Sequence, residues 1–191
     1  MSYKKPNNVI FVVIGILVFL ISYKLDRQVN LFFKSFRLPF LDFIFSIITN
    51  FGLVVFITLI VPIIILYKKN RKFSFLLIIT FLASFTLAFI IKLIVLRQRP
   101  AEILIYPFIN IIDYSFPSTH SMVVFSLLPA LIKWLPKQKY YWLAFAFLVA
   151  FSRVYFGVHY LSDVAFGAFF GYFLGFYLLL LYKKRYANKQ I

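Results

Sequence analysis

Six long apolar segments take up most of this 191-residue chain. They run over 9–23, 40–67, 73–96, 118–135, 140–155 and 160–182. A helix that crosses a bilayer needs about 20 predominantly apolar residues, and these segments come close to that length. With 63% hydrophobic and 14% charged residues, the chain is far more apolar than a soluble domain. The pattern predicts an all-α integral membrane protein: a six-transmembrane-helix bundle in which residues 1–191 form a single domain.

The basic residues are distributed unevenly between the two sides that these spans define. A net charge of +16 would favour nucleic-acid binding in a soluble protein. If the amino terminus is inside, the inner side carries 13 of the 21 basic residues and no acid, and the outer side carries the other 8 and all five acids. This asymmetry follows the positive-inside rule. It predicts a multi-pass protein of the cell (plasma) membrane with both termini cytoplasmic, and no nucleic-acid partner.

The first apolar segment and the stretch after it have two readings each. Segment 9–23 follows a basic start, as a secretory signal does, but no small-residue cleavage site follows it, so we predict a retained helix. The stretch 26–37, DRQVNLFFKSFR, has an apolar helical side and a basic one. It predicts a short interfacial helix after the first span, either bordering a lipid entrance or serving as a plain connector.

Two connections on the predicted outer side contain Lys92, Arg97, Arg99 and Arg153. A charged side chain at membrane depth costs about 2.5 to 3.5 kcal/mol on insertion scales, and any one of these could simply extend from a helix end to the interface. As a set they suggest an anion site. Lys92 and Arg99 are two helical turns apart on nearly one face, and Pro100 is expected to end that helix at Arg99. With Arg153 they can converge on one phosphate.

The start of the fourth apolar segment adds to this anion site. Ser118 follows Pro117 and is placed to be the N-cap of a helix. The backbone amides of Thr119 and His120 would then point at an anion on the helix N-terminus. Three cations, a helix start and a hydroxyl together predict a phosphate-binding pocket facing the outside of the cell.

The chain has two histidines, and each has a candidate chemical role. A lone histidine in a membrane helix more often makes a packing hydrogen bond. His159, however, has Asp163 four residues later, where side chains on one helix meet. A carboxylate on one ring nitrogen would leave the other nitrogen free to attack, as in a catalytic triad. His120 would protonate a leaving oxygen and later accept a proton from water.

Metal-assisted phosphate chemistry is the main alternative to this histidine mechanism. It requires clustered carboxylates or several histidine ligands. Five scattered acids and two histidines that already have roles do not provide such a set. We therefore predict no metal requirement and no cofactor.

Three short motifs in order resemble the signature of the type 2 phosphatidic acid phosphatase (PAP2) family. They are KLIVLRQRP from Lys92 to Pro100, PSTH from Pro117 to His120, and SRVYFGVH with a later Asp, from Ser152 to Asp163. The three-part match is far more specific than any single short motif. The six-helix plan resembles the membrane branch of that family over nearly the whole chain.

The resemblance implies a covalent phosphohistidine mechanism. His159 would be the nucleophile, Asp163 its partner and His120 the acid and base. The phosphate-binding residues would be Lys92, Arg99, Ser118, Thr119 and Arg153.

Three positions depart from the family pattern. Thr119 stands where the family usually has glycine, so the amide is kept but bulk and a hydroxyl are added. Leu161 stands where many relatives have proline, a change we expect to be harmless. Arg97 is outside the pattern and would be an additional phosphate contact or only an interfacial charge.

The last apolar segment carries Gly167, Gly171 and Gly175 at a spacing of four. Small residues at this spacing allow helices to approach closely. We predict that they pack within the bundle, stiffening the helix behind His159, and do not form a dimer seam. The oligomeric state is left open.

The expected substrate is a membrane lipid with a phosphate or diphosphate head group at the outer interface. The compact size resembles small bacterial family members that act on undecaprenyl diphosphate, and this analogy selects that lipid. Phosphatidic acid or phosphatidylglycerophosphate hydrolysis and a lipid phosphotransferase remain alternatives. A transporter or scaffold is the non-enzymatic alternative, but the charges at helix ends and the absence of a clear repeat disfavour transport.

Overall fold

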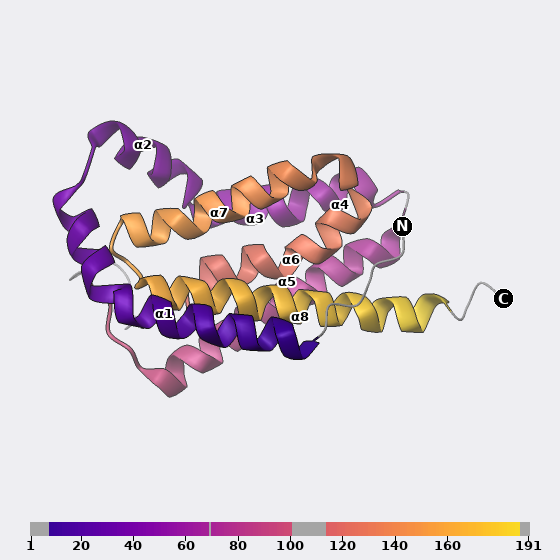
Figure 1. The fold of residues 1–191 in the computed structure, drawn as a ribbon. Coiled ribbons are helices and arrows are strands. Elements are labelled where there is room, and N and C mark those ends of the chain that lie inside the picture. Colours follow the sequence, from indigo (N-terminus) through magenta and orange to yellow (C-terminus); the bar gives the residue numbers. More distant parts are fainter. Residues whose placement is uncertain (1–7, 69, 101–113, 188–191) are drawn as a thin grey trace.

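The computed structural model describes residues 8–68, 70–100 and 114–187. These residues form helices and no strands. In chain order the helices are α1 (Asn8–Ser35), α2 (Pro39–Ile48), α3 (Phe51–Val55), the π-helical η1 (Phe56–Ile60), α4 (Val61–Leu66), α5 (Arg71–Val95), α6 (Thr119–Trp134), the 3-10 turn η2 (Pro136–Gln138), α7 (Lys139–Tyr155) and α8 (Leu161–Ala187). Figure 1 shows the long helices running side by side as a bundle.

Helix α6 is the centre of the bundle. Every residue from Ser121 to Leu131 is buried, because α5, α7 and α8 surround it. Two apolar clusters form around it: Val123, Leu127 and Leu131 face α5 and α8, and Val124 and Leu128 face α7. The outer helices instead leave many large apolar side chains exposed, as expected for helices that face lipid.

Helix α8 packs against α6 through its glycines, as the sequence predicted. A Cβ atom on Gly167 would lie 2.8 Å from the Ser118 carbonyl oxygen, and one on Gly171 would lie 2.3 Å from the Met122 carbonyl oxygen. At Gly175 the corresponding distance to the Ser126 carbonyl oxygen would be 1.8 Å. No side chain fits at these distances, so the glycines allow the two backbones to touch.

The predicted separate interfacial helix over 26–37 is wrong. Helix α1 continues unbroken from Asn8 to Ser35, because no glycine or proline interrupts it after the first span. Figure 1 shows α1 curving upward at its end. The helix ends at Ser35, and α2 begins at Pro39. Residues 26–35 of the predicted helix are therefore the last part of α1, which includes Asp26, and Phe36 and Arg37 follow its end.

Within the described residues, three helices are long and apolar enough to cross a membrane, over Val9–Ser35, Arg71–Val95 and Leu161–Tyr186. The second predicted span is broken: α2 and the helix over Phe51–Leu66 are bent by 51°, and together they could form a fourth. Helices α6 and α7 have 16 and 17 residues, so the predicted count of six spans stays a prediction. The chain is an apolar membrane protein, and the part of it that the structure describes is all-helical.

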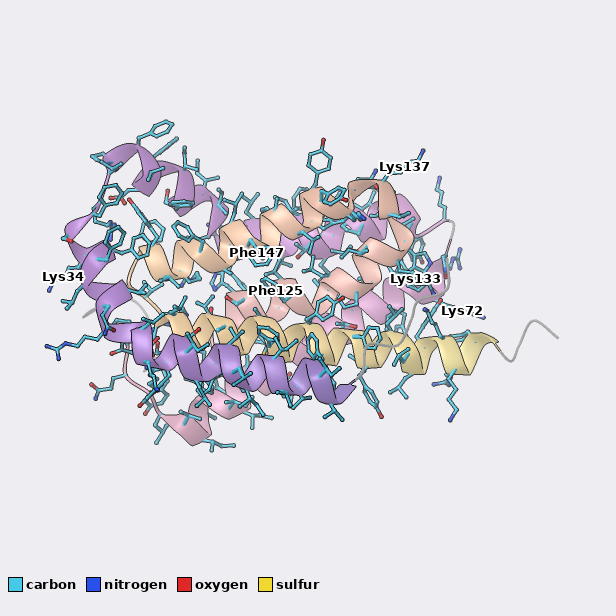
Figure 2. All side chains as sticks on the ribbon, viewed as in Figure 1. Lys34, Lys72, Phe125, Lys133, Lys137 and Phe147 are labelled. Atoms are coloured by element: carbon cyan, nitrogen blue, oxygen red, sulfur yellow. The ribbon has the colours of Figure 1, made fainter. Side chains whose placement is uncertain are left out.

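Basic side chains from the two predicted sides of the membrane lie at opposite ends of the bundle. Figure 2 shows Lys72, Lys133 and Lys137 at one end and Lys34 at the other. The first three belong to the predicted inner side and Lys34 to the outer side, so the helices keep these two sets apart. Among the residues counted for the predicted topology, Lys4, Lys5, Lys69, Glu102, Asp113 and Lys189 lie outside the described residues.

Candidate active site

The predicted site residues come from four helix ends that meet at one end of the bundle, on the left in Figure 1. Lys92 lies in the last turn of α5, and Thr119 and His120 begin α6. Arg153 lies in the last turn of α7 and Asp163 in the first turn of α8. Because consecutive helices run in opposite directions, residues as far apart in sequence as Lys92 and Asp163 reach the same end.

His159 and Asp163 face each other, although not on one helix. His159 lies two residues before α8, which begins at Leu161, so the expected placement on a helix is wrong. The chain turns sharply just before it, at Gly157, whose φ is 66°. The Nδ1 atom of His159 is 3.7 Å from Oδ2 of Asp163, and both side chains are almost fully buried. At this distance the carboxylate can orient the ring mainly through charge.

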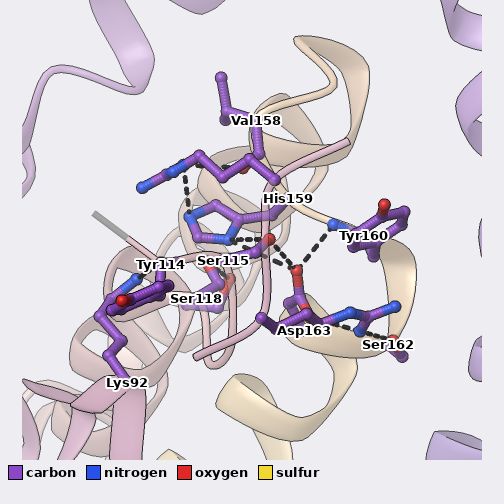
Figure 3. Close-up of polar contacts among 12 residues, drawn as sticks. Lys92, Tyr114, Ser115, Ser118, Val158, His159, Tyr160, Ser162 and Asp163 are labelled. Atoms are coloured by element: carbon purple, nitrogen blue, oxygen red, sulfur yellow. Dashed lines mark hydrogen bonds and ion pairs between the residues drawn. The ribbon is translucent and has the colours of Figure 1, made fainter. Parts of the chain in front are cut away.

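A serine that the sequence reasoning missed lies beside this pair (Figure 3). The Ser115 hydroxyl donates a hydrogen bond to Oδ2 of Asp163, and its oxygen is 3.5 Å from Nδ1 of His159. The backbone N–H of Tyr160 donates to the same carboxylate oxygen at 2.9 Å. Ser115 is fully buried. Its position three residues before Ser118 was the only available signal, and spacing alone gives no reason to select it.

The partners of His159 determine which ring nitrogen carries the proton. Nη1 of Arg99 lies 3.4 Å from Nε2 of His159 and donates to the Val158 carbonyl at 2.7 Å. A guanidinium group only donates hydrogen bonds, so Nε2 presents its lone pair to Arg99. Nδ1 then carries the proton and points it toward Ser115 and Asp163. In this tautomer the Nε2 lone pair faces Arg99, a cation that can bind an anion.

The position of Lys92 relative to Arg99 differs from the predicted one. Helix α5 ends at Val95, four residues before Arg99, because Leu96 adopts a left-handed conformation with φ of 53°. Lys92 and Arg99 therefore do not share a helical face. Lys92 is 7% exposed, and its Nζ donates to the carbonyl of Tyr114, the residue before Ser115 (Figure 3). Lys92 therefore contacts the backbone next to Ser115, the residue that donates to Asp163.

His120 and Arg153 share one partner, Thr49, which follows α2. Nε2 of His120 is 2.9 Å from the Thr49 carbonyl oxygen, and Nη1 of Arg153 donates to the Thr49 hydroxyl at 2.5 Å. Because a carbonyl only accepts, Nε2 of His120 carries the proton and Nδ1 is available for proton transfer. The backbone N–H of His159 donates to the backbone carbonyl of Arg153 at 3.3 Å, which links this group to His159. Nothing in the sequence pointed to Thr49.

Ser118 occupies the N-cap position of α6, as predicted, but its hydroxyl makes no capping hydrogen bond. It instead accepts from the Ser121 hydroxyl at 3.1 Å, and its N–H donates to the Asp163 carbonyl at 3.2 Å. This second contact fixes the start of α6 against the start of α8. Thr119 is the first residue of α6, so its amide lies at the helix N-terminus.

Arg97, the cation outside the family pattern, pairs with carboxylates. Its guanidinium contacts Asp163 at 2.6 Å and Asp26 at 2.7 Å. Neither expectation, an additional phosphate contact or an interfacial charge, describes this arrangement. Asp26 is 6% exposed within an apolar helix, and a buried acid in a membrane span is a signal that could have identified it.

A groove of about 640 Å³ lies between α1, the end of α7 and Pro100, the residue after Arg99. Phe33, Tyr155 and Phe156 form its aromatic wall, and Lys34 and Arg37 supply two basic side chains. Arg37 also stacks over Tyr155 and Phe156 and pairs with Asp42. The groove therefore combines an apolar surface with positive charge, close in sequence to Arg99 and His159.

Three comparisons place this chain among known proteins. It is 31% identical to an undecaprenyl-diphosphatase of Sulfolobus acidocaldarius over 123 residues, which cover 59% of this chain and only 56% of that relative. It is 28% identical to a lipid A 4'-phosphatase of Bacteroides thetaiotaomicron over 186 residues, 87% of this chain and 80% of the relative. A solved phosphatidylglycerolphosphate phosphatase from Bacillus subtilis has a TM-score of 0.67 at 26% identity, covering 91% of this chain and 96% of that one.

The family model with the description PAP2 superfamily matches residues 71–187. This range is more than half of the chain and contains all the predicted site residues. The solved structure with the same fold is described as a transmembrane PAP2 type phosphatase. The chain therefore belongs to the PAP2 superfamily.

Proposed function

We propose that this chain is a metal-independent membrane lipid phosphatase that transfers the phosphoryl group first to His159 and then to water. The observation that carries the proposal is the orientation of the His159 ring. Its Nδ1 faces Asp163 and Ser115, and its Nε2 faces the Arg99 guanidinium. This is the arrangement that an oriented nucleophile beside an anion-binding cation requires.

The proposed reaction has two steps. The lone pair of His159 Nε2 attacks phosphorus, the bond from phosphorus to the leaving oxygen breaks, and protonated His120 gives its Nδ1 proton to that oxygen. Water then attacks the phosphohistidine, His120 takes the proton from water, and the phosphorus–nitrogen bond breaks to release phosphate. Lys92, Arg99, Arg153 and the amides at the start of α6 would stabilise the charge on the phosphoryl oxygens.

The arrangement of acids supports a mechanism without a metal. Asp163 and Asp26 already share the Arg97 guanidinium, so they are not available as a pair of metal ligands. Within the described ranges, no three His, Asp or Glu side chains gather as a metal site would require. In this proposal the guanidinium and ammonium groups provide the positive charge.

For the substrate we propose undecaprenyl diphosphate, which becomes undecaprenyl phosphate. The name of the Sulfolobus relative supports this choice. The groove beside Pro100 also supports an amphipathic anion, because it joins an aromatic wall to Lys34 and Arg37. The names of the other two proteins make lipid A and phosphatidylglycerolphosphate the alternatives to test.

The test is phosphate release by purified protein in detergent, with EDTA present and each lipid supplied separately, together with phosphatidic acid. His159→Ala is compared with Tyr141→Ala, which removes an aromatic ring that is 77% exposed on α7. We expect wild type and Tyr141→Ala to release phosphate in EDTA. His159→Ala should lose at least about 1000-fold in rate, as expected when a covalent nucleophile is removed.

Each outcome identifies one part of the proposal. Loss of activity in EDTA that is restored by a divalent cation would overturn metal independence. Release from a different lipid would change only the substrate. Activity that persists in a folded His159→Ala variant would overturn the phosphohistidine mechanism. Transfer to added glycerol, detected as glycerol phosphate, would indicate a phosphotransferase.

A further inference from the structure

A cluster of charged and polar side chains lies on the side of Asp163 away from His159. Nη1 of Arg97 donates to Oδ1 of Asp163 at 2.6 Å and to the Ser162 hydroxyl at 2.7 Å, and Nη2 donates to Asp26 at 2.7 Å. Asp26 also accepts from the Ser162 N–H at 2.9 Å and from the Ser162 hydroxyl at 2.6 Å. These contacts join α1, the segment after α5, and the first turn of α8.

The cluster is shielded from water. The side chains of Asp163 and Asp26 are 0% and 7% exposed, and that of Arg97 is 21% exposed. The Arg97 guanidinium also lies 4.0 Å from the ring centre of Tyr160 and 5.5 Å from that of Tyr23. Burial lowers the pKa of Arg97, but the two carboxylates outweigh this effect and raise it above its ordinary value. The planar guanidinium therefore stays charged and can hold both carboxylates at once.

The two oxygens of the Asp163 carboxylate have different partners. Oδ1 is held by Arg97. Oδ2 accepts from Ser115 and from the Tyr160 N–H and faces the His159 ring. Because the far oxygen is held by a charged group, the carboxylate cannot rotate away from His159 without breaking a buried ion pair. Asp26 and Ser162 in turn fix the position of Arg97.

We propose that Arg97 and Asp26 are positioning residues for the reaction, which act through Asp163 to hold the His159 ring in its reactive orientation. This inference rests on the proposed function. Through Asp26, it gives α1 a part in the active site, although α1 lies outside the range that the family model matches. A purely structural cluster would only attach α1 to α8, and its loss would lower stability without slowing the chemical step of folded protein.

The test compares Arg97→Gln, Arg97→Lys and Asp26→Asn with Arg27→Gln, the same change at an exposed position next to Asp26. Protein folding is checked by size-exclusion profile and thermal midpoint in detergent, and kcat and KM are measured separately. We expect Arg97→Gln to lower kcat at least about 30-fold with KM changed less than about threefold, because the lost group acts on the transition state. Arg97→Lys should recover at least about fivefold of this loss, since it restores the charge without the fork.

A double-variant comparison distinguishes action through Asp163 from any other effect. In an Asp163→Asn background, adding Arg97→Gln should lower kcat by less than about threefold, because the group it positions is already gone. Unchanged kcat in folded Arg97→Gln and Asp26→Asn, or equal losses in both backgrounds, would overturn the inference. Wild-type protein that releases no phosphate would instead contradict the proposed function. If Arg97→Gln does not fold, Asp26→Asn is judged by the loss in kcat expected for Arg97→Gln, and Arg97→Lys by the smaller loss that remains after its partial recovery.

Discussion

At the scale of single residues, the Ser115 hydroxyl is the contact most open to a direct test. It donates to Asp163 Oδ2, and its oxygen lies 3.5 Å from His159 Nδ1. The hydroxyl therefore bridges the carboxylate and the ring, whose direct Nδ1–Oδ2 distance is 3.7 Å. Removing it leaves a buried carboxylate oxygen with one donor fewer, at a cost of about 1 to 2 kcal/mol. We expect Ser115→Ala to lower kcat by roughly 5- to 30-fold with little change in KM. Steady-state kinetics on the accepted lipid measures both.

The matched control for this prediction is Ser126→Ala. Ser126 is also fully buried, but its hydroxyl donates to the Val123 carbonyl within α6, far along the helix from His120. We expect kcat of this variant to stay within twofold of wild type, about the scatter of such measurements. Equal losses of kcat in the two variants would contradict the prediction, because the loss would then follow from removing any buried hydroxyl and not from the position of Ser115.

The candidate site residues could be predicted from the sequence where a residue type and its spacing already imply chemistry. Lys92, Arg99 and His159 are of this kind: Arg99 contacts the His159 ring, and Lys92 contacts the carbonyl of Tyr114 beside it. Ser115 and Thr49 could not be predicted, because a serine or threonine in an apolar chain has many possible partners. Their positions depend on how α2, α6 and α8 meet, which is set by long-range packing. Their roles, like those of the predicted residues, stay predictions until the variants are assayed.

At the scale of elements, the contact between α6 and α8 holds the two halves of the site together. A methyl group at Gly175 would lie 1.8 Å from the Ser126 carbonyl oxygen, so the helices would have to separate. Overpacking usually costs about 1 to 3 kcal/mol, and backbone against backbone leaves little room for relief. We expect Gly175→Ala to lower the thermal midpoint in detergent by about 5 °C or more.

Gly15→Ala is the control for this change. A methyl group there would lie 3.2 Å from a ring carbon of Phe169, a side chain that can move. Its midpoint should therefore change by less than about 2 °C, as expected for a small, relieved overlap. A tolerated Gly175→Ala would mean that α8 can shift along α6 without loss, contrary to the packing described above.

The helices themselves were largely predictable from the apolar segments, but their ends were not. The start of α6 at Thr119 follows from Pro117 and Ser118. The end of α5 at Val95 could not be predicted, since leucine at position 96 rarely adopts a left-handed conformation. The continuation of α1 to Ser35 was missed because the change in polarity after Tyr23 suggested a new element.

At the scale of the whole molecule, the order of the helices places two groups of residues at opposite ends of the bundle. The candidate site and Lys34 lie at one end, and Lys72, Lys133 and Lys137 lie at the other. The positive-inside rule predicts that the second end is cytoplasmic. A lipid phosphate would then reach the site from the outer leaflet.

Cysteine labelling tests this orientation directly, because the chain contains no cysteine and every introduced thiol is unique. We expect Lys34→Cys to react with a membrane-impermeant maleimide on intact cells. Lys137→Cys should react only after the membrane is permeabilised, since it lies at the opposite end. Lys137→Cys should keep phosphatase activity within about threefold, as this position is exposed at the end of the bundle away from the groove. Lys34 lines the groove, so folding of Lys34→Cys is checked by its size-exclusion profile and not by its activity. The reverse labelling pattern would place the site in the cytoplasm and exclude lipids of the outer leaflet as its substrates.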